Sequence, residues 1–314
     1  MARPFSLFFL LLIAAAPLKQ IATIPLPDVQ GRIDHMAFDA TGHRLFIAAL
    51  GNGTVEVIDT EKRHRIQSLK GFNEPQGVAW LADSKQLVVA SGGDGMVRFF
   101  DAELKPRGEI RDLDDADNAR YDEKSHLVYV GYGAGALAVI DPAKRQKIAD
   151  IQPAGHPESF QFEKNGPRIF VNVPSAHHVA VVDREKRALV TTWPIAQSAN
   201  FPMALDEDHQ RVLIATRKPA KLVAIDTNTG KEIAAADCVA DPDDLFVDQA
   251  NQRIYIIGGG GAVSVIDSKS FEKLAEIKTA DGARTGFWVD SLRQLFVAAP
   301  ARGARIAELR IYGE

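Results

Sequence analysis

The 314-residue sequence contains a single cysteine, Cys238, so no disulfide bond can form within the chain. A lone thiol is compatible with an oxidising compartment but does not identify the compartment. Cys238 lies in the sequence Ala-Asp-Cys-Val-Ala, in the region of an expected outer strand. A packed thiol is the ordinary role of cysteine in such a place, so we do not expect it to act as a nucleophile.

An excess of positive charge is also missing. The chain has 37 lysines and arginines against 41 aspartates and glutamates, which gives a formal net charge of −4. Proteins that bind nucleic acid usually carry a basic patch or stripe. The composition therefore predicts no nucleic-acid partner.

The sequence lacks the common signatures of catalysis and phosphate binding. There is no Gly-x-Ser-x-Gly motif around a nucleophile. Glycine-rich stretches such as Gly92–Gly95 and Gly258–Gly261 do not have P-loop spacing, and no helix that could hold a phosphate is expected after them. We assign these glycines to tight turns that need a positive φ.

Long hydrophobic runs are absent except at the N-terminus. Residues 1–16 combine Arg3, an apolar run from Phe5 to Ile13 and three alanines, which is the layout of a signal peptide. The run is too short for a bilayer span of about 20 residues. We predict export to the periplasm or outside the cell, with no membrane span after export and residues 17–314 as one domain. An uncleaved N-terminal segment is the alternative.

The sequence does contain a repeat. An apolar run ending in aspartate recurs every 40–43 residues, at Asp59, Asp101, Asp141, Asp183, Asp226 and Asp267. A seventh copy ends at Tyr312, without the aspartate. Within each period, turn residues separate four short apolar runs that are rich in β-branched residues.

Four strands per period of about 40–50 residues predict the blades of a β-propeller. We expect an all-β fold of seven four-stranded antiparallel blades. The last copy lacks a fourth strand, and residues 18–27 form an extra strand at the start, so the N-terminal strand should complete the last blade and close the ring. The apolar residues of the second and third strands should be buried, including Phe46, Val57, Phe170, Val181, Tyr255 and Val265.

Three segments show the repeat most clearly: RLFIAALGNGTVEVID (44–59), RIFVNVPSAHHVAVVD (168–183) and RIYIIGGGGAVSVID (253–267). They resemble the YVTN-type repeats of the YncE-like β-propeller family, and the resemblance covers residues ~18–312. It implies a seven-bladed propeller in an exported bacterial protein. It implies little about chemistry, because propellers host binding modules, scaffolds and enzymes.

Aligning the blades on their first strands places a ring of polar residues at the top of the central channel. We predict a ligand-binding channel mouth made of Asp34, His35, Gln76, Asp117, Asn118, Arg120, Glu158, Asp243, Asp244 and Arg284. Gathered carboxylates raise one another's pKa unless a cation compensates. A divalent cation held by Asp34, Asp117, Glu158 and Asp243 is one interpretation. Salt bridges from the arginines, or acids that cap their own loops, are the others.

A second possible metal site lies on blade four. His156, Glu158, His177 and His178 fall on the same face, and imidazole suits copper or zinc. The alternative is a solvated histidine pair on a polar loop. No cofactor beyond a divalent cation is indicated.

Two classes of function remain open. The first is a non-catalytic binding or scaffold protein, expected to be a monomer, that takes a small-molecule or protein ligand at its top face. The second is a metal-assisted small-molecule enzyme of the lactonase or lyase type. The absence of a catalytic signature favours the first.

Overall fold

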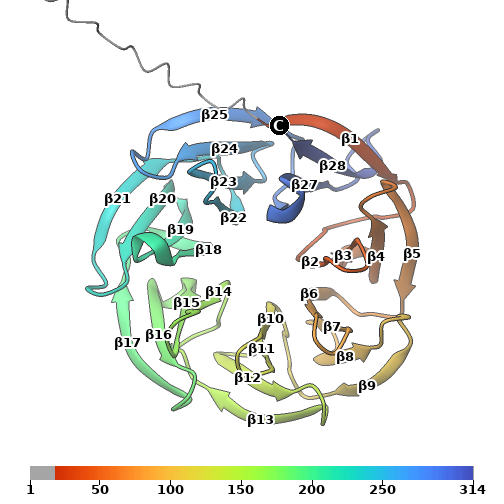
Figure 1. Cartoon of the computed structure of the whole chain (residues 1–314), viewed down its shortest axis with the longest axis horizontal. Helices are drawn as coiled ribbons and strands as arrows, with labels where there is room; N and C mark the ends of the chain where they lie inside the picture. The colour runs from red at the N-terminus through yellow and green to blue at the C-terminus, as the bar shows by residue number, and fades with distance from the viewer. Residues whose placement is uncertain (1–17, 314) are drawn as a thin grey trace, which may run out of the picture.

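The computed structural model describes residues 18–313 as seven four-stranded antiparallel sheets arranged in a ring (Figure 1). Each sheet is one blade, with its first strand beside the central channel and its last strand on the rim. The predicted seven-bladed propeller is confirmed. The expected signal peptide, residues 1–16, lies outside the described residues.

The blades follow one another along the chain. Blades one to three are β2 (Met36–Asp39), β3 (Arg44–Ala49), β4 (Thr54–Asp59) and β5 (His64–Lys70); β6 (Pro75–Leu81), β7 (Gln86–Ser91), β8 (Met96–Phe100) and β9 (Pro106–Ile110); and β10 (Ala119–Asp122), β11 (Leu127–Tyr132), β12 (Ala136–Asp141) and β13 (Gln146–Ile151). Blades four to six are β14 (Phe160–Phe162), β15 (Arg168–Val173), β16 (His178–Asp183) and β17 (Ala188–Pro194); β18 (Ser198–Asp206), β19 (Arg211–Lys218), β20 (Ala220–Asp226) and β21 (Glu232–Asp237); and β22 (Pro242–Asp248), β23 (Arg253–Gly258), β24 (Ala262–Asp267) and β25 (Lys273–Lys278). Blade seven is β26 (Thr285–Val289), β27 (Gln294–Ala299), β28 (Ala307–Gly313) and β1 (Lys19–Leu26). Short 3-10 turns lie at Leu50–Asn52, Pro174–Ala176, Glu207–His209 and Asp290–Leu292.

The core lies between the blades. The second and third strands have blades on both sides, which explains their nearly continuous apolar runs. The six residues predicted for this core are all buried: Phe46, Val57, Phe170, Val181, Tyr255 and Val265. The outer strands β13, β21 and β25 alternate between half-buried and exposed positions because only one of their faces is covered.

The first and last strands of the described chain close the ring. Strand β1 pairs antiparallel with β28, in a register that runs from Lys19 opposite Gly313 to Leu26 opposite Ala307. The side chains of Ile24 and Leu26 are buried in the core of blade seven. The predicted closure is therefore confirmed, and β1 covers the edge of β28.

The recurring aspartate belongs to the turn between the third and fourth strands. Asp183 Oδ1, for example, accepts hydrogen bonds from the backbone N–H groups of Glu185 at 3.0 Å and Lys186 at 2.9 Å. Asp59, Asp141, Asp226 and Asp267 accept backbone hydrogen bonds in the same way. Blade seven has no such turn, because its fourth strand comes from the other end of the chain. Tyr312 can therefore replace the aspartate there.

No helix within residues 18–313 is long and apolar enough to cross a membrane.

Candidate functional site

A polar pocket of about 270 Å³ lies at the top of the channel, the end at which the innermost strands begin. All seven blades contribute to it, so the whole ring fixes its shape. The lining residues are Arg32, Asp34, His35, Gln76, Asp115, Asp117, Asn118, His156, Glu158, Ser159, Phe201, Arg217, Asp243, Asp244 and Arg284.

The same backbone arrangement presents these side chains in three blades. In each, two consecutive residues before the first strand exchange backbone hydrogen bonds with one residue of the second strand. These sets are Asp34-His35 with Ala48, Asp117-Asn118 with Gly131, and Glu158-Ser159 with Asn172. The repeat of the sequence therefore places equivalent side chains around one mouth.

A glycine allows close packing beside Asp117. A Cβ atom on Gly77 of blade two would lie 2.0 Å from the carbonyl oxygen of Asp117 and 2.7 Å from the nitrogen of Ala119. Only glycine permits this approach of the two backbones. It helps to set the position of Asp117 in the pocket.

Nine of the ten residues predicted for the channel mouth line this pocket. Arg120 instead lines a second cavity of about 820 Å³, which continues along the innermost strands past Met36, Trp80 and Phe287. Its guanidinium donates to Ser159 Oγ at 3.2 Å, and burial lowers its pKa to about 10. Arg120 thus contacts the pocket from the far side of Ser159.

His35 lies among acids in this pocket. Its Nε2 atom is 3.6 Å from Asp34 Oδ1 and 3.4 Å from Asp117 Oδ1, and the side-chain amide of Asn118 lies 2.9 Å away. Burial on its own would lower the pKa of His35, but the charges of Asp34 and Asp117 outweigh it and raise this pKa to about 10. His35 is therefore an imidazolium at neutral pH.

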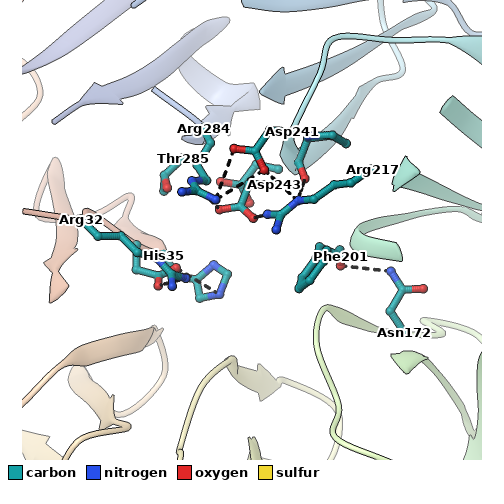
Figure 2. A network of polar contacts seen from close by, with 12 residues as sticks. Arg32, His35, Asn172, Phe201, Arg217, Asp241, Asp243, Arg284 and Thr285 are labelled. Carbon is teal, nitrogen blue, oxygen red and sulfur yellow. Dashed lines mark hydrogen bonds and ion pairs between the residues drawn. The ribbon is translucent and has the colours of Figure 1, made fainter. Parts of the chain in front are cut away.

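The opposite wall is a cluster of arginines and aspartates (Figure 2). The guanidinium of Arg217 lies 3.8 Å from the centre of the Phe201 ring and pairs with both Asp243 and Asp241, the latter at 3.0 Å. Arg284 pairs with Asp241 at 3.3 Å. This wall contains the arginine salt bridges that were one interpretation of the sequence.

Burial is the main cause of the raised pKa values of the remaining carboxyl groups. Removal from water raises the pKa of Asp243 to about 6 and that of Asp244 to about 7. Burial, reinforced by the charge of Asp117, raises the pKa of Glu158 to about 7. Asp34, which Arg32 pairs at 2.7 Å, also has a raised pKa because it is buried.

Loop capping does not account for Asp117, Glu158 or Asp244, although Asp34 accepts a hydrogen bond from the backbone N–H of His35. Asp244 accepts a backbone hydrogen bond from Gly286 at 2.8 Å, but Gly286 belongs to the next blade. Within residues 18–313, the carboxylates of Asp117 and Glu158 accept no hydrogen bond from a backbone N–H group.

One group of side chains in the described part of the chain has metal-ligand geometry. Ligand atoms of Asp117, His156 and Glu158 all lie within 4.8 Å of one another. This group combines members of both predicted metal sets. It does not include Asp34 and Asp243 of the first set.

The two other histidines of the second set do not join this group. His177 is exposed at the turn after Pro174–Ala176, whereas His178 is buried with Nε2 3.3 Å from the carbonyl of Pro153. Consecutive residues that enter a strand point to opposite sides, which separates the pair.

Five further lining residues were not predicted for the site: Arg32, Asp115, Ser159, Phe201 and Arg217. In the alignment of the blades, Phe201 is equivalent to Asp34 and Asp117, so the repeat alone could have identified Phe201 as a lining residue. Arg217 lies next to the last residue of β19 and is held in place by partners from blade six. Cys238 lies outside the pocket, and burial raises the pKa of its thiol to about 12.

No model of a known protein family matches the chain, and a search of curated proteins finds no similar sequence.

Proposed function

We propose that this propeller is a non-catalytic binding protein that takes a small polar ligand into the channel mouth. The observation that carries the proposal is a polar pocket of about 270 Å³ to which every blade contributes charged or polar side chains. A ring of closed blades holds these groups in place before a ligand arrives, which reduces the entropic cost of binding. Convergent polar groups in a concave site are the usual mark of ligand recognition.

The charges indicate which ligands to expect. Six carboxylates line the pocket: Asp34, Asp115, Asp117, Glu158, Asp243 and Asp244. Three of the cationic side chains, Arg32, Arg217 and Arg284, are already paired with aspartates. The pocket therefore favours a small ligand with a positive charge or several hydrogen-bond donors, such as an amine or a polyol.

The wider setting is part of the same proposal. The repeat segments resemble the YncE-like family, and the N-terminal sequence is typical of a signal peptide. We infer an exported monomer, in the periplasm or secreted, whose ligand reaches the pocket from the top face. A protein that presents a polar side chain or terminus to the same pocket is the scaffold version of this function.

The proposal is tested by screening amines, amino acids and polyols for a rise in melting temperature, in the presence of a chelator. The expected result is stabilisation by at least one class of compound, lost in Asp243→Asn and retained in the control Asp208→Asn, whose carboxylate is exposed outside the pocket. If no compound stabilises the protein, or if both variants respond like the wild type, the channel mouth is not the binding site.

One observation favours a second candidate, a metal-assisted enzyme of the lactonase or lyase type. The imidazolium of His35 lies 3.4 Å from Asp117, which belongs to the group with metal-ligand geometry. A proton donor beside a metal-binding group is an arrangement that hydrolytic enzymes use. A lactone-hydrolysis screen of the metal-supplemented protein tests it, and activity that survives His35→Gln would rule out this mechanism.

A further inference from the structure

We propose that Asp117, His156 and Glu158 bind one divalent first-row transition metal ion, with zinc as the best fit. Their ligand atoms lie within 4.8 Å of one another. Two ligand atoms of a tetrahedral zinc ion lie about 3.3–3.6 Å apart, because the bonds are about 2.0–2.2 Å long, so the three ligand atoms have to approach one another by at most about 1.5 Å. Small side-chain movements are therefore enough to close the site.

One ring nitrogen of His156 is already held by a hydrogen bond. Its Nδ1 lies 2.6 Å from the carbonyl oxygen of Gly133, on the neighbouring blade, which keeps a proton on Nδ1. The other nitrogen, Nε2, is left with a free lone pair. Metal-binding histidines commonly donate their second ring N–H to a backbone carbonyl in this way, because the bond fixes both the ring and its tautomer.

The two carboxylates lack sufficient partners. Asp117 is only 8% exposed, and its buried Oδ1 atom accepts no hydrogen bond. No hydrogen bond or ion pair reaches the Glu158 carboxylate within residues 18–313. A buried carboxylate oxygen without a hydrogen-bond partner is costly, so Asp117 favours a cation at this wall, where the half-buried Glu158 adds a second carboxylate.

The cationic side chains of the pocket do not pair with both of these carboxylates. His35 lies beside Asp117 at 3.4 Å but is shared with Asp34. Arg217 and Arg284 pair with Asp241 on the opposite wall, and Arg32 pairs with Asp34. Among the described residues, no arginine of the pocket therefore pairs with Asp117 or Glu158, which leaves these two carboxylates available to a bound cation.

The ligand set indicates the class of metal. One imidazole and two carboxylates suit zinc and its neighbours, whereas calcium and magnesium prefer oxygen ligands alone. This differs from the all-oxygen set predicted from the sequence and shares His156 and Glu158 with the histidine-containing alternative. Three protein ligands also leave a coordination position open, and all three residues line the pocket. The inference goes beyond the proposed function, since the ion is bound whether or not an organic ligand is present.

The test is calorimetric titration of chelator-treated, full-length protein with zinc chloride. We expect one ion per chain, with magnesium and calcium binding more weakly. His156→Ala and Glu158→Gln should each weaken zinc binding by at least about tenfold. His177→Ala is the matched control, because His177 is an exposed histidine of the same blade that lies outside the group. Unchanged thermal unfolding would show that the variants fold.

Cobalt gives a second readout. Cobalt bound by one nitrogen and two oxygen ligands should show visible absorption bands in the wild type and in His177→Ala, but not in His156→Ala. Absence of saturable 1:1 zinc binding, or equal weakening by His177→Ala and His156→Ala, would overturn the proposal. Because the organic-ligand screen is performed with a chelator, either proposal can fail while the other stands.

Discussion

Arg211 and Asp206 form a buried ion pair at 2.7 Å that also joins two blades. The same guanidinium of blade five donates to the carbonyl oxygen of Ser268, in the turn of blade six. Arg44 repeats this arrangement with Asp39 and the carbonyl of Ala102. In each case an arginine at the start of a second strand neutralises an acid of its own blade and holds the next blade.

The first prediction concerns this pair. Arg211→Met should lower the free energy of unfolding by about 3 kcal/mol, because it removes the buried guanidinium beside Asp206 and leaves that carboxylate with Gln249 and His209 as partners. Adding Asp206→Asn should restore part of the loss. Urea denaturation measures both. Arg111→Met, which removes an exposed partner of Glu109, should change stability by less than about 1 kcal/mol; an equal loss there would contradict the argument.

The second prediction concerns ring closure. Deleting residues 1–26 removes β1 and exposes the edge of β28, whereas deleting residues 1–17 leaves β1 in place. Loss of the buried Ile24 and Leu26 side chains costs about 1.5–3 kcal/mol each. The longer deletion should therefore lower the melting temperature by at least about 5 °C relative to the shorter one. Equal melting temperatures would mean that β1 does not secure the ring.

The third prediction tests the packing between blades four and five. Phe170 is fully buried, with its ring centre 5.4 Å from that of Trp193. Phe170→Ala should cost about 3–5 kcal/mol in chemical denaturation, since it leaves a cavity that the rigid ring cannot collapse. Val190→Ala, on the exposed outer strand of the same blade, serves as the control. A loss below about 1 kcal/mol for Phe170→Ala is incompatible with this burial.

The fourth prediction concerns pH. Burial raises the pKa of Asp244 from 3.8 to about 7, although the charge of His35 opposes the shift. A carboxyl group with a raised pKa stabilises the fold when it is protonated, and this contribution is lost as the pH rises from about 4 towards 7. Asp244→Asn imitates the protonated form and can still accept from Gly286.

The melting temperature of Asp244→Asn, relative to that of the wild type, should therefore increase as the pH rises from about 4 to about 8. Asp208→Asn, an exposed change outside the pocket, should show a constant difference over the same range. A difference for Asp244→Asn that is constant or falls with pH would show that Asp244 does not titrate as described.

The sequence predicts the ring and much of the pocket for a single reason. Repeats place equivalent residues at equivalent points, so aligning Asp34 with Asp117 and Glu158 also placed them at one mouth. Arg120 lines the second cavity and not this pocket, because it lies within β10, one step further down the channel. The repeat period and spacing predict which strand of which blade carries a side chain, but they do not predict how far down the channel that side chain lies.

The sequence pattern could not predict the contacts between blades. The ion pairs of Arg217 with Asp241 and Asp243 join different blades, and no local sequence motif predicts them. The hydrogen bond from His156 to Gly133 likewise crosses a blade boundary. Such contacts depend on how neighbouring blades pack against each other. A repeat alignment could therefore identify candidate metal ligands, but it could not select Asp117, His156 and Glu158 from among them.

The pairing of Lys19 with Gly313 makes the first and last strands of the described chain neighbours, so the ring is joined by the strand pair with the greatest sequence separation within residues 18–313. Every other strand pair is a local hairpin that can form as soon as its residues are available. The entropic cost of closing the longest loop therefore falls on one step, and that step has to come late in folding. A circular permutant that begins at β2 and carries β1 after β28 would turn this contact into an ordinary hairpin. It would keep the same native ring, and its folding would no longer require closure of the longest loop.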